Sequence, residues 1–153
     1  MSPLIKTFLI SMVPVIELRG AIPFAIASGA SAVPAACAAM LGNLLPVPLI
    51  LLFIRRSLAW MKARGGRLGD LALWVERHAA KRTPSVQKYA FWGLALFVGI
   101  PLPGTGAWTG ALIAAMLNLP FKRAFPAIVL GVLAAGIVVT LAASGVKLAF
   151  IGG

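Results

Sequence analysis

Two charged residues, Glu17 and Arg19, interrupt a largely apolar stretch that runs from Leu4 to Ala30. An ion-forming side chain in the hydrocarbon region of a membrane is costly unless it faces protein, water or a bound molecule. Pro14 and Pro23 flank the pair, and proline interrupts a regular helix because it lacks an amide donor. The pattern predicts a broken helix with a binding role instead of a simple membrane anchor.

The composition is typical of an integral membrane protein. Of the 153 residues, 61% are hydrophobic and three are acidic, and the mean hydropathy is +1.00. The net charge of +11 is concentrated, because nine of the fourteen Lys and Arg residues fall between Arg55 and Lys88. Basic segments beside apolar spans orient membrane proteins and touch anionic lipid head groups. We therefore expect membrane lipids as partners and no nucleic acid.

Four apolar blocks predict an all-α membrane protein whose residues 1–153 form one membrane domain. The second block, Val33–Ile54, and the fourth, Ala124–Val146, contain no charge. Each is long enough to cross a hydrocarbon core of ~30 Å at ~1.5 Å per residue, so each predicts a transmembrane helix. Pro46 and Pro48 are expected to kink the first of these helices.

The first and third blocks, Leu4–Ala30 and Tyr89–Leu119, are longer than one span and are broken near the middle by Pro and Gly. In the third block the limbs Tyr89–Ile100 and Ala107–Asn118 hold twelve residues each. Each limb would be ~18 Å long and would reach only about the middle of the bilayer. These lengths predict re-entrant helical hairpins, whose irregular tips must be buried in protein or line a cavity.

The two halves of the chain resemble each other. An offset of 86 residues aligns Gly20 with Gly106 and Pro34 with Pro120. Each half then consists of a hairpin followed by a spanning helix, with repeat one at 4–54, a basic connector at 55–88 and repeat two at 89–150. One full span per half inverts the second copy, and inverted repeats with broken helices are a recurring transporter plan.

The distribution of positive charge is compatible with two topologies. Re-entrant hairpins place the connector, Lys122 and Arg123 on the cytoplasmic side, whereas four plain spans place Lys122 and Arg123 outside. The two topologies place the same number of positive charges on the cytoplasmic side, so charge does not decide between them. The Pro and Gly breaks favour the re-entrant hairpins. After Gly65 and Gly66 the connector is either an interfacial amphipathic helix or a solvated basic segment.

Glu17 and Arg19 are the first candidate site residues. A carboxyl group in a medium of low dielectric can hold a proton or a cation, and a guanidinium can bind a phosphate or carboxylate through its planar fork. Alternatively, the two side chains satisfy each other or cap exposed backbone at the hairpin tip. The sequence leaves these alternatives open.

The second interruption supplies the other candidates. Its prolines remove amide donors and its glycines allow close backbone approach. A helix that begins near Gly106, with a mirror-image start near Gly20, would direct unpaired N–H groups at the midplane and form an anion cradle beside Arg19. Trp108 either lines this pocket or only packs. The complete set of candidates is Glu17, Arg19, Gly20, Pro23, Pro101, Pro103, Gly104, Thr105, Gly106, Trp108 and Thr109.

Several classes of chemistry lack their residues in this sequence. There is no Ser-His-Asp set, no cluster of metal ligands and no Gly-rich phosphate loop with Lys. Cys37 is the only cysteine, so an intrachain disulfide is excluded. We expect no enzymatic activity, no cofactor and no metal.

The segments Pro14-Val-Ile-Glu-Leu-Arg-Gly-Ala-Ile-Pro23 and Pro101-Leu-Pro-Gly-Thr-Gly-Ala-Trp-Thr-Gly110 resemble the two signature segments of the small multidrug export protein family. The resemblance covers nearly the whole chain and implies a multi-pass protein of the prokaryotic inner membrane. More remotely, the hairpins resemble the DedA superfamily, whose members are implicated in moving undecaprenyl phosphate and other lipids. That resemblance implies roles for Glu17 and Arg19 at a re-entrant tip, although the second tip here lacks an acid and an Arg.

These observations favour a secondary transporter or lipid-carrier flippase that holds an anionic, phosphate-bearing head group between the two tips. One alternative is a proton-coupled exporter of cationic drugs that uses Glu17, although Arg19 would oppose a bound cation. Another is a membrane scaffold that transports nothing. Because one copy of 153 residues can hardly enclose a pathway, we expect a homodimer.

Overall fold

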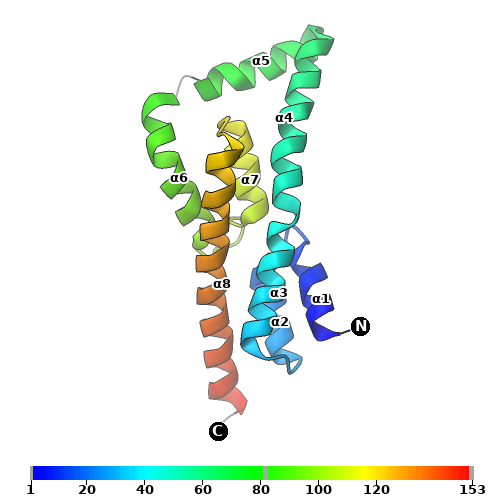
Figure 1. The fold of residues 1–153 in the computed structure, drawn as a ribbon, viewed down its shortest axis with the longest axis vertical. Helices are drawn as coiled ribbons and strands as arrows, with labels where there is room; N and C mark the ends of the chain where they lie inside the picture. Colours follow the sequence, from blue (N-terminus) through cyan, green and yellow to red (C-terminus); the bar gives the residue numbers. More distant parts are fainter. Residues whose placement is uncertain (1, 81–82, 152–153) are drawn as a thin grey trace.

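The structure, a computed structural model, describes residues 2–80 and 83–151, and within these ranges it contains helices and no β-strand. This confirms the all-α fold class (Figure 1). The helices of the described residues are α1 (Pro3–Ser11), α2 (Glu17–Ala27), α3 (Ala32–Leu44), α4 (Pro46–Arg64), α5 (Gly66–Ala80), α6 (Thr83–Gly99), α7 (Ala107–Met116) and α8 (Phe121–Ile151).

Two long helical stretches, Ala32–Arg64 and Phe121–Phe150, are apolar and long enough to cross a membrane. The first joins α3 to α4 through Leu45, whose backbone is helical, so the chain continues past Pro46 with only a local interruption. This stretch also runs ten residues beyond the predicted block, because α4 carries the first basic residues of the connector. The 31 residues of α8 correspond to ~46 Å, which exceeds the ~30 Å hydrocarbon core.

Two pairs of short helices, α1 with α2 and α6 with α7, lie beside the long ones and enter from opposite ends (Figure 1). The loop of each pair, residues 12–16 and residues 100–106, lies near mid-height. Residues 12–20, which include the first turn of α2, are here called the first tip, and residues 100–106 the second tip. The α2–α3 link and the α7–α8 link consequently lie at opposite ends of the molecule. The third apolar block does break where predicted, but α6 starts at Thr83, six residues earlier than expected.

The basic connector contains a helix, which agrees with one of the two alternatives left open for it. Gly65 and Gly66 have φ values of +65° and +61°, which a residue with a Cβ rarely adopts, and they end α4 and begin α5. In Figure 1, α5 crosses one end of the molecule between α4 and α6. Residues 81 and 82 of the connector lie outside the described residues.

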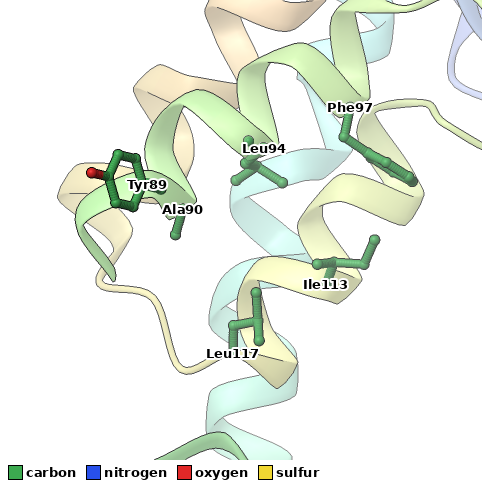
Figure 2. Close-up of a pocket in the computed structure, with 7 residues that line it drawn as sticks. Tyr89, Ala90, Leu94, Phe97, Ile113 and Leu117 are labelled. Atoms are coloured by element: carbon green, nitrogen blue, oxygen red, sulfur yellow. The ribbon is translucent and has the colours of Figure 1, made fainter. Parts of the chain in front are cut away.

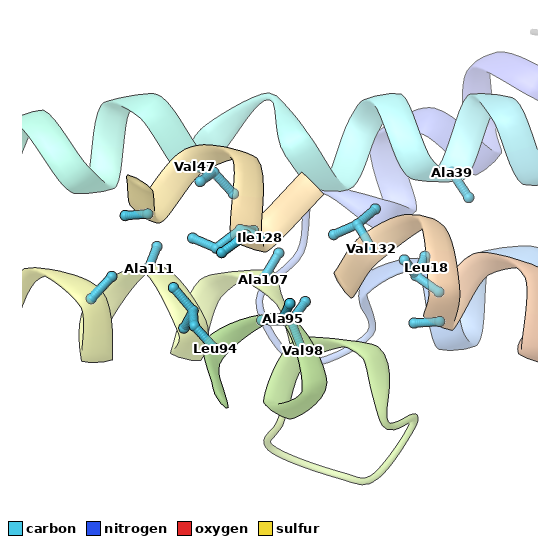
Figure 3. Close-up of a cluster of buried hydrophobic side chains, with 14 of the residues drawn as sticks. Leu18, Ala39, Val47, Leu94, Ala95, Val98, Ala107, Ala111, Ile128 and Val132 are labelled. Carbon is cyan, nitrogen blue, oxygen red and sulfur yellow. The ribbon is translucent and has the colours of Figure 1, made fainter. Parts of the chain in front are cut away.

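The core is formed mainly by small residues packed around the middle of α8. Ile128 and Val132 are fully buried and lie between Val47 of α4 and Leu94 and Val98 of α6 (Figure 3). Small residues let helix backbones approach closely, which is the usual way that helices pack in membranes, where lipid removes the hydrophobic driving force.

The outer surface of the molecule is also apolar. Large hydrophobic side chains such as Phe53, Leu141 and Leu148 have relative exposures of 71%, 68% and 74%. Soluble monomers rarely expose large apolar patches, whereas a bilayer solvates apolar side chains. Together with the two long apolar helices, this surface is typical of a membrane protein.

Gly131 of α8 provides a test of this packing. A Cβ at this position would lie 2.6 Å from Val98 Cβ and 2.8 Å from the carbonyl oxygen of Ala95, so Gly131→Ala should force α6 away from α8. We expect a loss of about 1–3 kcal/mol in the free energy of unfolding, the usual cost of overpacking. Gly145→Ala on the same helix is the control, because its Cβ would meet nothing within 4 Å. Equal unfolding midpoints of the two variants in detergent would contradict the packing described.

Candidate functional site

Glu17 connects the first tip to the start of α7. It is the first residue of α2, has a φ of +50° and is only 4% exposed. Its carboxylate Oε1 accepts a hydrogen bond from the backbone N–H of Trp108 at 3.3 Å and lies against Gly106, the N-cap residue of α7. Because the N-terminus of a helix carries a partial positive charge and unpaired N–H groups, the carboxylate caps α7 from another helix.

Arg19 connects the same tip to the end of α6. Its guanidinium donates to the carbonyl oxygen of Leu102, to Thr105 Oγ1 at 2.9 Å and to the carbonyl oxygen of Ile100 at 3.4 Å. Ile100 directly follows Gly99, the last residue of α6, where the helix leaves carbonyl groups unpaired and carries a partial negative charge, and Leu102 and Thr105 lie further along the second tip. The guanidinium thus stabilises the C-terminal end of α6.

The two charges therefore serve different helix ends. Within the described part of the chain, no ion pair joins Glu17 to Arg19, because each side chain is directed to a different end of the second tip. The hypothesis that they satisfy only each other is wrong for this structure, and the alternative that they cap exposed backbone agrees with it. A third link comes from the indole Nε1–H of Trp108, which donates to the carbonyl oxygen of Met12 at 3.1 Å.

Thr105 organises the second tip locally. Its hydroxyl lies 2.6 Å from the carbonyl oxygen of Ile100 and 2.9 Å from that of Leu102, and it also accepts from Arg19. Gly104 has a φ of +82°, which explains why a glycine stands at this turn. The second tip is thus an ordered loop, held by its own threonine and by a cation from the first tip.

A cavity of about 550 Å³, here called the tip cavity, lies between the two tips. It brings together most of the predicted candidates: Glu17, Arg19, Gly20, Pro101, Pro103, Gly104, Gly106 and Thr109. Pro14, Val15 and Ile16 also line it, and their position beside Glu17 in the sequence was the only signal for them.

Three of the predicted site residues do not line the tip cavity. Pro23 borders a second cavity, which runs between α2 and α8. Thr105 and Trp108 act through their hydrogen bonds, so the packing role of Trp108 agrees better with the structure than the pocket-lining role. The helix start expected near Gly20 lies three residues earlier, at Glu17, and Gly20 therefore lies inside the first turn of α2.

One polar atom in the site is unsatisfied. Arg19 Nε is buried and has no hydrogen-bond partner, although Arg19 lines both the tip cavity and the α2–α8 cavity. A third cavity, between α6 and α7, is lined by apolar residues and Tyr89 and has no comparable group (Figure 2). Among residues 2–80 and 83–151, no three His, Cys, Asp or Glu side chains gather in one place. The tip cavity is therefore the candidate functional site.

Residues 17–138 match a protein-family model described as putative small multi-drug export protein. The match covers most of the chain and includes Glu17, Arg19, Gly20 and the whole second tip. Comparisons with curated proteins and with solved structures gave no significant match.

The cap that Glu17 provides to α7 predicts a coupling with Gly106. A Cβ at Gly106 would collide with the Glu17 carboxylate, so Gly106→Ala should displace that carboxylate and reduce the free energy of unfolding by about 1–3 kcal/mol. In a Glu17→Ala background the same substitution should cost much less, because the colliding group is gone. A double-mutant cycle of unfolding free energies measures this difference.

Gly93→Ala on α6 is the control for this cycle, since its Cβ would meet nothing within 4 Å. It should cost the same in both backgrounds. If Gly106→Ala also costs the same in both backgrounds, Glu17 does not hold the N-terminus of α7.

Proposed function

The chain belongs to the small multi-drug export protein family, and we propose that it is a membrane transporter that binds the anionic head group of an amphiphilic substrate in the tip cavity. Arg19 carries the proposal, because this residue lines the cavity and its buried Nε donor has no partner in the protein. An unsatisfied buried donor costs about 1–3 kcal/mol, and an oxygen of a phosphate or carboxylate would remove that cost.

The surroundings of Arg19 suit such a head group. The first turn of α7 begins at Ala107, and its N–H groups and dipole favour an anion. Glu17 occupies part of this position, so the substrate would compete with the carboxylate for the end of α7. Exchange between the two anions gives a way to bind and release the substrate without leaving the helix end unpaired.

The proposal includes a membrane arrangement. Each hairpin is re-entrant, α3–α4 and α8 span the bilayer, and the two halves form an inverted repeat in a multi-pass protein of the prokaryotic inner membrane. The lengths of the short helices, the meeting of the tips near mid-height and the links at opposite ends support this arrangement (Figure 1). The connector 55–88 and the α7–α8 link then face the cytoplasm, as the positive-inside rule favours.

Two alternatives explain fewer of the contacts. In an exporter of cationic drugs, Glu17 would be the exchange carboxylate, but it faces the positive end of α7 and lies near Arg19, and both disfavour a cation. A scaffold would explain the hydrogen bonds between the tips but gives no role to the tip cavity or to the unpaired Arg19 Nε. We propose neither an enzymatic activity nor a cofactor.

We propose that the functional unit is a homodimer. The tip cavity is lined by the first tip, α2, the second tip and α7, and neither long apolar stretch of this copy forms a wall of it. A second copy would supply that wall, and the exposed apolar faces of the molecule give it a surface on which to pack.

The re-entrant arrangement predicts the accessibility of the two links. In a Cys37→Ala background, cysteines introduced at Ser31 and Phe121 should react with an impermeant thiol reagent from opposite sides of the membrane. Ser31 precedes α3 and Phe121 begins α8, so both sit at the ends of spanning helices. Labelling of both positions from the same side would exclude the hairpins and indicate four plain spans.

The substrate charge predicts the effect of changing Arg19. Binding of dodecyl phosphate to purified protein in phosphatidylcholine nanodiscs should weaken about tenfold or more in Arg19→Gln, because a charged hydrogen bond is lost. Arg19→Lys should fall between this variant and the wild type, because it keeps the charge without the planar fork. Unfolding midpoints of both variants separate loss of binding from loss of fold.

Arg123→Gln is the matched control, because it removes an exposed positive charge far from the tips along α8 and should leave binding unchanged. Dodecyltrimethylammonium tests the opposite charge. If the wild type prefers this cation, and if Glu17→Gln but not Arg19→Gln abolishes its binding, the cation-exporter alternative replaces the proposal.

A further inference from the structure

The cavity between α2 and α8 has a volume of about 650 Å³ and adjoins the tip cavity, since Arg19 and Pro101 line both. Apart from the stem of Arg19, the walls are apolar until the far end, where Lys147 of α8 is reached. Pro23 and Ile26 supply one wall, and small or branched residues of α8 supply the other. This cavity is therefore an apolar groove with a cation at its outer end.

The length of the groove matches one leaflet of a bilayer. Its wall on α8 extends from Val138 to Phe150, and these two residues lie ~18 Å apart along the helix axis. Half of a ~30 Å hydrocarbon core is about 15 Å. One end lies at the tips, near mid-height, and the other lies where α2 and α8 end (Figure 1). A lipid chain of a single leaflet would fill this distance.

Lys147 fits a negatively charged head group at the outer end. Its Nζ donates to the carbonyl oxygen of Ile26 at 3.3 Å and so satisfies a backbone group in the last turn of α2. An ammonium group has three N–H donors, so two remain for an oxygen outside the protein. Lysine side chains at the ends of membrane helices extend toward the interface, where anionic phosphates are found.

We infer that the α2–α8 groove binds one hydrocarbon chain of an anionic phospholipid, with the phosphate at Lys147 and the end of the chain beside Arg19 and Pro101. The inference rests on the membrane arrangement proposed above, because that arrangement puts Lys147 at the non-cytoplasmic interface. It adds a second site, distinct from the tip cavity, through which a lipid of the outer leaflet contacts the tips.

The test uses a phosphatidylglycerol that carries a diazirine at the end of one acyl chain, at low density in phosphatidylcholine nanodiscs with the full chain. The free energy of lipid binding is a poor readout, because an acyl chain that enters the groove only exchanges the apolar bilayer for an equally apolar environment. The position of the crosslink is a better one. Mass spectrometry should find it on peptides around Arg19, Pro23 and Pro101.

Ala142→Trp tests the groove itself, because Ala142 lines it and an indole would fill it. This variant should lose most of the crosslink at the tips. Leu141→Trp is the matched control, since Leu141 is the next residue of α8, is 68% exposed and does not line the groove. Its crosslink should equal that of the wild type.

Lys147→Gln tests the head group, because the amide can still donate to Ile26 while the charge is lost. The wild type should give several-fold more crosslink with the phosphatidylglycerol probe than with a phosphatidylcholine probe of the same chains, and Lys147→Gln should abolish this preference. A preference that survives in Lys147→Gln would overturn the head-group assignment.

Two further results would overturn the inference. A crosslink around Val146 and Phe150 would mean that the lipid lies in the opposite direction, and an equal crosslink in both tryptophan variants would mean that the groove holds no chain. A different result would contradict the proposed function: dodecyl phosphate would bind independently of Arg19. The groove could still give the crosslink described, so the two failures are distinguishable.

Discussion

The arrangement of the two hairpins depends on one electrostatic match. A broken helix inside a membrane leaves unpaired N–H groups at one end and unpaired carbonyl groups at the other, and lipid can satisfy neither. Here the first tip supplies both partners, because Glu17 reaches the positive end of α7 and Arg19 reaches the negative end of α6. Reversing the two charges would set each against a like partial charge. The same pair therefore fixes how the tips meet and where the tip cavity forms.

This double use explains why structural and functional roles are difficult to separate at Glu17 and Arg19. Both side chains hold the second tip, yet both also line the tip cavity. Arg19 has spare capacity, since its Nε is buried without a partner, and Glu17 occupies a position where an external anion would bind. In the proposed transporter the substrate replaces an internal contact of similar charge, so the helix ends stay satisfied through the cycle.

The cavities connect this site to the lipid. The tip cavity adjoins the α2–α8 groove at Arg19 and Pro101, which line both, and the groove leads along α8 to Lys147. Small residues make this possible, because α8 packs closely on α6 at Gly131, and its later part, from Val138 to Phe150, lines the groove with α2. A single helix thus provides both part of the core, around Ile128 and Val132 (Figure 3), and one wall of the groove that we propose binds a lipid chain.

The sequence by itself determined the helical fold class, the apolar character typical of a membrane protein, the two stretches long enough to span a membrane and the breaks at both tips, because hydropathy, Pro and Gly act locally along the chain. It also identified most of the residues around the tip cavity. Only the tertiary structure decided that Glu17 and Arg19 do not pair, that Trp108 binds the first tip through Met12, and that Lys147 closes a groove. The hydrogen bonds that decide these points join residues more than 80 positions apart in the sequence. The periodicity of apolar residues carries no information on which distant helix end a charged side chain will meet.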